Sequence, residues 1–253
     1  MNLLLVMSLA ILGYGALSGN WFALDAAKLP RIMRGLPWLS DSALSQKHVQ
    51  IVCFFIGAFH MSMARTWRAL TACMAIDTRR DGMRAFFNKV REALGHVGWG
   101  VFLWGNYGLA KLLIVDGGEI ASLGPAYRLL YAAGAVLILL FSVNWLDMGD
   151  VIYMPFTFIN SFVDLLSYIR LFAVGLSGVY IAGSFNGMAS SLTQLSPWMI
   201  PLSLLVILFG HLLNVALALM GVLVHGIRLN TLEFSGHMGI SWGGRPYKPL
   251  SKP

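Results

Sequence analysis

The chain has 253 residues and a formal net charge of +7, with 57% hydrophobic and only 11% charged residues. Soluble domains carry about 25% charged residues, so the composition excludes an ordinary soluble fold. Most basic residues lie between or beyond apolar blocks, where membrane topology and anionic lipid explain them better than nucleic acid does. The two cysteines, Cys53 and Cys73, lack metal-ligand spacing, and we expect neither a metal site nor a disulfide.

Six apolar blocks are predicted to cross a bilayer, whose core takes about 20 residues of helix. In chain order they are residues 2–22, 49–66, 98–115, 126–146, 154–190 and 199–227. Backbone groups in the bilayer core must be bonded within a helix or a closed barrel, and these blocks lack the alternation of barrel strands. We therefore predict an all-α transmembrane chain with about six spanning helices, forming a single membrane domain over residues 1–253.

Lysines and arginines in short loops predict the orientation of the chain. The strongest cluster follows the second block and comprises Arg68, Arg79, Arg80, Arg84, Lys89 and Arg91. With this loop in the cytoplasm, the loops 116–125 and 191–198 lie outside and the tail 231–253 lies in the cytoplasm. The loop 23–48 disagrees, because it is basic and yet falls outside in this arrangement.

The last two blocks are longer than an upright helix requires. Residues 199–227 would form a helix of about 44 Å, against a hydrocarbon core of about 30 Å. Pro155 and Pro197 mark the ends of the preceding block, and no proline interrupts its middle. We therefore predict two long, strongly tilted helices at 154–190 and 199–230. The alternative for the first is a helix followed by a re-entrant piece, favoured by glycines in its second half.

Arg170 lies deep in the fifth block, where an arginine at the bilayer centre costs about 2.5–3.5 kcal/mol or more. Such a residue normally faces protein or a water-filled cavity. Helical spacing places Ser167 and Ser177 on its side of the helix, which suits tight packing or a hydrated path. Two alternatives remain: an arginine whose head group reaches the interface, and an internal ion pair with Asp164.

Arg228 ends the sixth block, and a polar stripe leads back from it along the helix. The stripe contains His225, Gly221, Asn214 and Gly210. Its two glycines allow another helix to approach closely, and its polar members are unusual in a bilayer. We expect this stripe to border water or a titrating partner.

Three stretches resemble one known family. SYIRLFAVGLSG, GHLLNVALALMGVLVHGIRLNTLEF and GGRPYKPL resemble, in order and spacing, the membrane domain of rotary V/A-type ATPases, in the subunit called a or I. The resemblance implies a stator beside a rotating proteolipid ring, with two half-channels that lead ions to and from the ring carboxylates. By position, Arg170 matches the essential arginine, Arg228 the second arginine, and His225 a polar residue near a half-channel.

The chemistry of Arg170 agrees with that role. Desolvation keeps a ring carboxyl group neutral in lipid, whereas a fixed guanidinium favours its charged form and releases the proton. Arginine stays charged at any relevant pH, so it also blocks a direct leak between the half-channels. The half-channel candidates are Ser167, Ser177, Asn214 and Asp164.

The resemblance also implies partners and a location. We expect the proteolipid ring, the peripheral-stalk and central-stalk subunits and membrane lipid as partners, no nucleic acid, and no cofactor or catalytic residue. The location is a bacterial or archaeal plasma membrane, with the C-terminus cytoplasmic. Family members have eight spanning helices and a large cytosolic N-terminal half, and we expect this chain to correspond to the membrane part. The ion, H⁺ or Na⁺, and the direction, ATP synthesis or hydrolysis, stay open.

Other functions are alternatives to this one. A stand-alone secondary transporter or channel would use Arg170 and Arg228 to bind an anion. A membrane-embedded enzyme lacks a nucleophile–base pair, and a non-catalytic assembly fragment would not carry ions.

Overall fold

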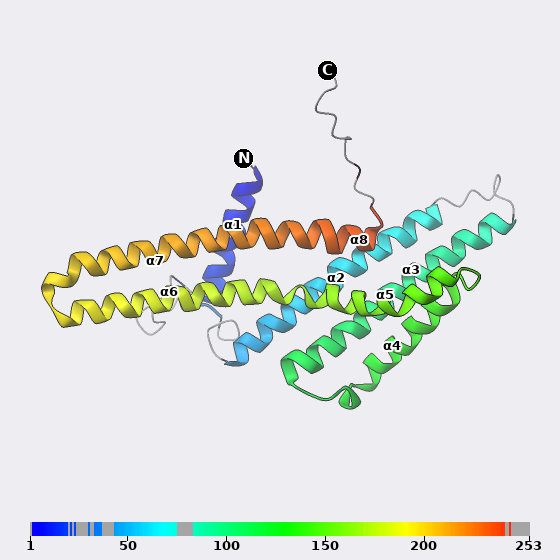
Figure 1. The fold of residues 1–253 in the computed structure, drawn as a ribbon, viewed down its shortest axis with the longest axis horizontal. Helices are drawn as coiled ribbons and strands as arrows, with labels where there is room; N and C mark the ends of the chain where they lie inside the picture. The colour runs from blue at the N-terminus through cyan, green and yellow to red at the C-terminus, as the bar shows by residue number, and fades with distance from the viewer. Residues whose placement is uncertain are drawn as a thin grey trace, which may run out of the picture.

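The computed structural model describes residues 2–19, 43–74 and 83–240, together with 21, 23, 30, 33–36 and 243. Within these ranges every regular element is a helix (Figure 1), so the prediction of an all-α chain is confirmed. Arg79 and Arg80, and the tail beyond residue 243, lie outside the described residues.

The described helices are as follows in chain order. The first four are α1 (Asn2–Ser18), α2 (Ala43–Met74), α3 (Met83–Ala110) and α4 (Pro125–Leu137). The π-helical turns η3 (Lys111–Asp116) and η5 (Ile138–Ser142) extend α3 and α4, and η4 (Ile120–Ser122) lies between them. There follow α5 (Met148–Leu166), α6 (Ile169–Leu195), η6 (Pro197–Met199), α7 (Ile200–Met220), η7 (Gly221–Gly226), η8 (Leu229–Phe234) and α8 (Ser235–Met238).

Four described helices are long and apolar enough to cross a membrane. They are Gln46–Met74, Pro125–Ser142, Met148–Leu195 and Pro197–Met238, and each contains or overlaps one of the predicted segments. The other two predicted segments, 2–22 and 98–115, correspond to α1 and to the second half of α3 with η3. Helix α1 has 17 residues, fewer than the about 20 that cross a bilayer core. The number of six spans and the tilt of the last two stay predictions.

The fifth predicted segment consists of two helices joined without a loop. At Ser167 and Tyr168 the chain tightens: the N–H of Tyr168 donates to the carbonyl of Leu165 (3.2 Å), and the N–H of Leu171 donates to that of Tyr168 (3.1 Å). Such bonds between residues three apart are typical of a short 3₁₀ turn. Neither proline nor glycine causes this break, which is why the sequence predicted one continuous helix.

The start of the fifth segment and the end of the sixth differ from the prediction. Pro155 lies inside α5, because that helix already begins at Met148, where Asp147 accepts a hydrogen bond from the backbone N–H of Gly149 (2.9 Å). The last segment continues through η7 and η8 to Met238, beyond residue 230. The start of the predicted tail is therefore helical.

Helices α2 to α5, which we call the bundle, enclose the core. Phe54, Met61, Leu103 and Leu165, from α2, α3 and α5, have no exposed surface, and they belong to one hydrophobic cluster. A second cluster forms around Trp99, Phe102 and Ile138, where α3 meets α4, η5 and α5.

Helices α6 and α7, which we call the hairpin, run side by side in opposite directions and extend past the bundle (Figure 1). Their close approach depends on glycine. A Cβ atom at Gly210 of α7 would lie 2.2 Å from Cγ of Phe185 of α6, and one at Gly221 would lie 2.7 Å from Cγ1 of Val174. The hydroxyl of Ser203 adds a hydrogen bond across the pair, to the carbonyl of Ala189 (2.9 Å).

Candidate functional site

Arg170 is the second residue of α6, directly after the break that separates this helix from the bundle. Tyr168, two residues earlier, is 2% exposed and lies against α2 at Gly57, where a Cβ atom would come within 2.7 Å of its ring. Its side chain is partly exposed and has no hydrogen bond or ion pair with any described residue. The guanidinium is thus open to a group from outside the described chain.

The predicted neighbours of Arg170 make other contacts. Oδ2 of Asp164 lies 3.1 Å from Nε2 of His237, so the described residues contain no ion pair between Asp164 and Arg170. Ser167 donates its hydroxyl proton to the carbonyl of Asp164 (2.6 Å), and Ser177 donates to the carbonyl of Val174 (2.8 Å). Both serine hydroxyl groups therefore bond the backbone of their own segment.

Arg228 lies between the two π-helical turns η7 and η8. Its side chain is 52% exposed, and its Nε lies 3.7 Å from Oε1 of Glu233, whose side chain is 6% exposed. The two residues are five apart, which is the spacing that a π-turn brings together. The second oxygen of Glu233, Oε2, is buried and has no hydrogen-bond partner among the described residues.

The polar stripe that precedes Arg228 packs largely against α6. Oδ1 of Asn214 would lie 3.0 Å from a Cβ atom at Gly178, and the two stripe glycines, Gly210 and Gly221, meet α6 as described above. His225 is half-buried, and its Nδ1 has no hydrogen bond within the described chain. The close approach of a second helix, predicted from the glycines, is thus present in the geometry.

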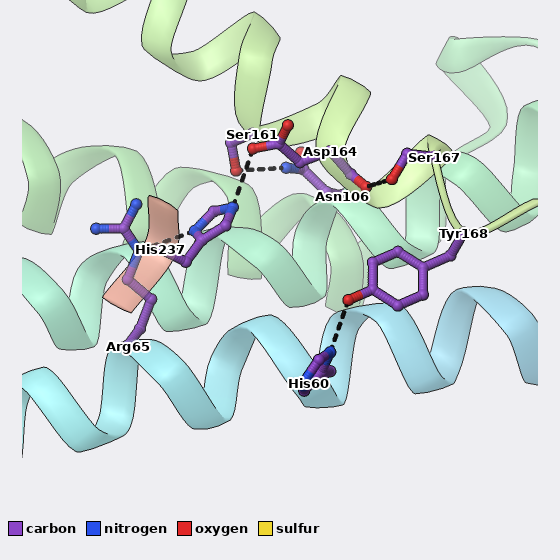
Figure 2. A network of polar contacts seen from close by, with 8 residues as sticks. All are labelled: His60, Arg65, Asn106, Ser161, Asp164, Ser167, Tyr168 and His237. Atoms are coloured by element: carbon purple, nitrogen blue, oxygen red, sulfur yellow. Dashed lines mark hydrogen bonds and ion pairs between the residues drawn. The ribbon is translucent and has the colours of Figure 1, made fainter. Parts of the chain in front are cut away.

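A chain of polar side chains connects α2, α8 and α5 (Figure 2). Nε of Arg65 donates to Nδ1 of His237 (3.0 Å), and Nε2 of His237 lies 3.1 Å from Oδ2 of Asp164. We call these three residues the polar chain. Sequence reasoning considered only Asp164 of the three, because Arg65 is 172 positions from His237.

Further polar contacts hold the bundle together around the polar chain (Figure 2). Asn106 of α3 donates from Nδ2 to the hydroxyl of Ser161 of α5 (3.2 Å) and accepts at Oδ1 from the hydroxyl of Tyr131 of α4. His60 of α2 shares a hydrogen bond with the hydroxyl of Tyr168 (2.8 Å). The one signal for these residues in the sequence is their polarity within apolar helices. In the part of the chain that the structure describes, no three His, Cys, Asp or Glu residues gather to hold a metal ion.

Two known proteins can be aligned with nearly the whole of this chain. It is 33% identical over 272 aligned residues to the V-type ATP synthase subunit I of Borreliella burgdorferi, which covers 99% of this chain and 41% of that protein. It is 34% identical to the V-type ATP synthase subunit I 1 of Treponema pallidum, covering 94% of this chain and 37% of that protein. An A-type ATP synthase subunit I of Archaeoglobus fulgidus is 35% identical over 92 residues, 36% of this chain and 14% of its own length.

The chain therefore spans about two fifths of the length of the first two relatives. No family model matches the chain, and no solved structure matches it. Its apolar helices and its relatives together make it an integral membrane protein. The chain belongs to the family of V-type and A-type ATP synthase subunit I.

Proposed function

We propose that this chain carries ions across the membrane as the stator part of a V/A-type rotary ATPase, with Arg170 as the fixed charge that a proteolipid ring passes. The ring, the stalk subunits and membrane lipid are its partners, and its C-terminus lies in the cytoplasm. The relatives named V-type and A-type ATP synthase subunit I support the assignment to such a machine. The observation that supports the mechanism is the Arg170 side chain, which is partly exposed and has no hydrogen bond or ion pair with the described residues.

An unpaired guanidinium in a membrane suits a partner that arrives and leaves. A permanent internal carboxylate would neutralise Arg170 and weaken its attraction for a passing carboxyl group. Asp164, the nearest acidic candidate along the chain, is instead bonded to His237. A ring carboxyl group that meets Arg170 would lose its proton, because the positive charge favours the carboxylate.

Arg228 is the second charge in this proposal. Its side chain is half-exposed, and its distance of 3.7 Å from Glu233 exceeds that of a charge-assisted hydrogen bond, about 2.7–2.9 Å. Arg228 can therefore contact the ring or line a half-channel together with His225. We also assign Asp164, Ser167, Ser177 and Asn214 to the surroundings of the ion path.

Replacement of Arg170 by glutamine in the assembled complex tests the proposal. Glutamine keeps the length and hydrogen-bonding capacity of the side chain in part but lacks its charge. We expect Arg170→Gln to abolish ATP-driven ion uptake into membrane vesicles. The control is Arg91→Gln, which removes an exposed arginine of α3 and should leave uptake unchanged. Retained coupled uptake in Arg170→Gln would sink the assignment.

The alternative function, a stand-alone anion transporter, is tested with the same variant. The chain alone, reconstituted in liposomes, should transport nothing if it needs a ring. Anion uptake by the chain alone, lost in Arg170→Gln, would favour the alternative.

A further inference from the structure

An open pocket of about 150 Å³ lies beside the polar chain, between α2, α3, α5 and α8; we call it the cavity. Trp99 and Gly236 contribute to its walls, whose surface is more apolar than polar, and its polar side chains are those of Arg65, Thr157, Asn160, Ser161, Asp164 and His237. A water molecule takes up about 30 Å³ of liquid and needs two to four polar partners, so this cavity has the size and the lining to hold several waters. Polar side chains of this kind within membrane-length helices indicate contact with water.

The direction of the hydrogen bonds in the polar chain follows from the chemistry of arginine. A guanidinium can only donate, so Nδ1 of His237 accepts the bond from Arg65. The single proton of the neutral imidazole is then on Nε2, which donates it to Oδ2 of Asp164 (3.1 Å). Arg65 thus fixes the tautomer of His237 and holds its Nε2–H toward Asp164.

Asp164 has one carboxylate oxygen left for a ligand. Oδ2 is bonded to His237, whereas Oδ1 has no hydrogen bond or ion pair with the described residues, and the side chain is 37% exposed. A carboxylate with one oxygen hydrogen-bonded to the protein and the other accessible to water can bind a cation without moving. His237, in contrast, is 4% exposed and uses both ring nitrogens within the polar chain.

The cavity is also close to Arg170 along the chain. Asp164 precedes Arg170 by six residues, a rise of about 9 Å along a helix. The hydroxyl of Ser167 bonds the carbonyl of Asp164 (2.6 Å), which ties the end of α5 to the break before Arg170. An ion at Asp164 therefore lies within two helical turns of the proposed fixed charge.

We propose that this cavity is a water-filled access site for the transported ion, and that Asp164 accepts the ion there while Arg65 and His237 position its carboxylate. The inference rests on the proposed function and adds Arg65, His237 and the cavity to it. The ligand is a monovalent cation. If it is a hydronium ion, its proton passes to Oδ1 of Asp164, leaving water, and then moves from Oδ1 to the next water. If it is Na⁺, Oδ1 and waters coordinate it.

Two neighbouring residues of α5 provide a matched test of water access. Both side chains are exposed: Asn160 lines the cavity, whereas the adjacent Ile159 is apolar and does not line it, on a surface suited to lipid. In the assembled complex, with Cys53 and Cys73 replaced by alanine, Asn160→Cys and Ile159→Cys are treated with a membrane-impermeant cationic methanethiosulfonate. Because only a hydrated thiol ionises and reacts, we expect Asn160→Cys to label at least about tenfold faster, read on this chain by mass spectrometry.

The same labelling tests whether the cavity is on the ion path. The adduct should block ATP-driven uptake, measured with a pH-sensitive dye and with radioactive Na⁺, in Asn160→Cys and not in Ile159→Cys. Equal labelling of the two variants, or labelling of Asn160→Cys without loss of uptake, would overturn the inference. A purely structural polar chain would not produce the block.

A conservative substitution of His237 tests whether this residue positions the Asp164 carboxylate. In His237→Gln, the amide oxygen can accept from Arg65 and the amide N–H can donate to Asp164, so uptake should be largely kept. His237→Leu should lower it about tenfold, since it leaves the Arg65 guanidinium and the Asp164 carboxylate without the imidazole that joins them. Equal uptake in His237→Gln and His237→Leu would remove His237 from the site. Loss of uptake in Arg170→Gln with no labelling of Asn160→Cys would refute only the access site, whereas retained uptake in Arg170→Gln would refute the function on which it rests.

Discussion

The bundle and the hairpin differ in how much of their apolar surface is buried within the chain. The most apolar part of α2, in the bundle, is 33% buried within the chain, against 11% for the segment that contains α7. The outer bundle helix α4, with η5, is also 11% buried, so the difference lies in the inner helices of the bundle. Phe54 and Met61 of α2 are fully buried, whereas Leu208 and Phe209 of α7 are 61% and 58% exposed. The bundle is therefore held by its own core, and the hairpin presents most of its apolar surface to what surrounds it. In a membrane, lipid can cover that surface at little cost.

The two regions share one kind of helix contact and differ in another. Both bring helices together at glycines: Gly134 of α4 lies against Phe102 in the bundle, and Gly210 and Gly221 leave room for Phe185 and Val174 in the hairpin. The bundle adds contacts between polar side chains of different helices, such as the one between Asn106 and Ser161. The difference can be tested with equal substitutions in the two regions.

The largest effect is expected when leucine is replaced by alanine once in the bundle and once in the hairpin. Leu103→Ala in the bundle removes a fully buried side chain and should lower the free energy of unfolding by about 2–5 kcal/mol. Leu208→Ala in the hairpin, at a side chain 61% exposed, should cost less than about 0.5 kcal/mol. Denaturation in mixed detergent micelles measures both. Similar losses would show that the hairpin is packed as tightly as the bundle.

A smaller effect, with opposite signs, is expected from glycines of the hairpin. Gly210→Ala places a methyl group 2.2 Å from Phe185 and should destabilise the hairpin by about 1–3 kcal/mol. At Gly187 a methyl group would meet nothing within 4 Å, so Gly187→Ala should stabilise α6 by about 0.5–1 kcal/mol. Amide hydrogen exchange of α6 and α7 should be faster in the first variant and slower in the second. Equal exchange would contradict glycine-mediated packing.

The smallest effect is expected from polar contacts. Asn106→Leu leaves the hydroxyl groups of Tyr131 and Ser161 without their shared partner and should cost about 1–2 kcal/mol. Ser177→Ala of the hairpin removes a bond to the carbonyl of its own helix and should change stability by less than about 0.5 kcal/mol. Thermal unfolding in detergent compares them, and an equal or larger loss in Ser177→Ala would show that polar contacts matter as much in the hairpin.

The helices could be predicted from the sequence because a bilayer allows only helices and closed barrels, and these long apolar runs lack the alternation of barrel strands. The break before Arg170 could not, because Ser167 and Tyr168 carry no local signal for it, and the burial of Tyr168 against Gly57 is a tertiary contact. Pro155 misled the prediction for a related reason. A helix start depends on its cap, here Asp147, more than on a nearby proline.

The sequence alone could indicate the candidate site only where a single residue carries the signal. An arginine within an apolar block, such as Arg170, is conspicuous because its cost demands a role. The polar chain needs residues 73 and 172 positions apart, which no local pattern brings together. The stripe before Arg228 assumed 3.6 residues per turn, whereas η7 and η8 are π-helical, and this spacing pairs Arg228 with Glu233.

The break at Ser167 and Tyr168 also has a mechanical consequence. Helix α6 has 27 residues and is about 40 Å long at 1.5 Å per residue, and the break is where it leaves the bundle. A sideways push near the far turn of the hairpin acts through that whole length as a lever, so the torque is greatest at this joint. The ring of Tyr168 packed against Gly57 and the contact of His237 in α8 with Asp164 are among the contacts that resist it. In the stator role proposed above, a turning rotor would load this joint.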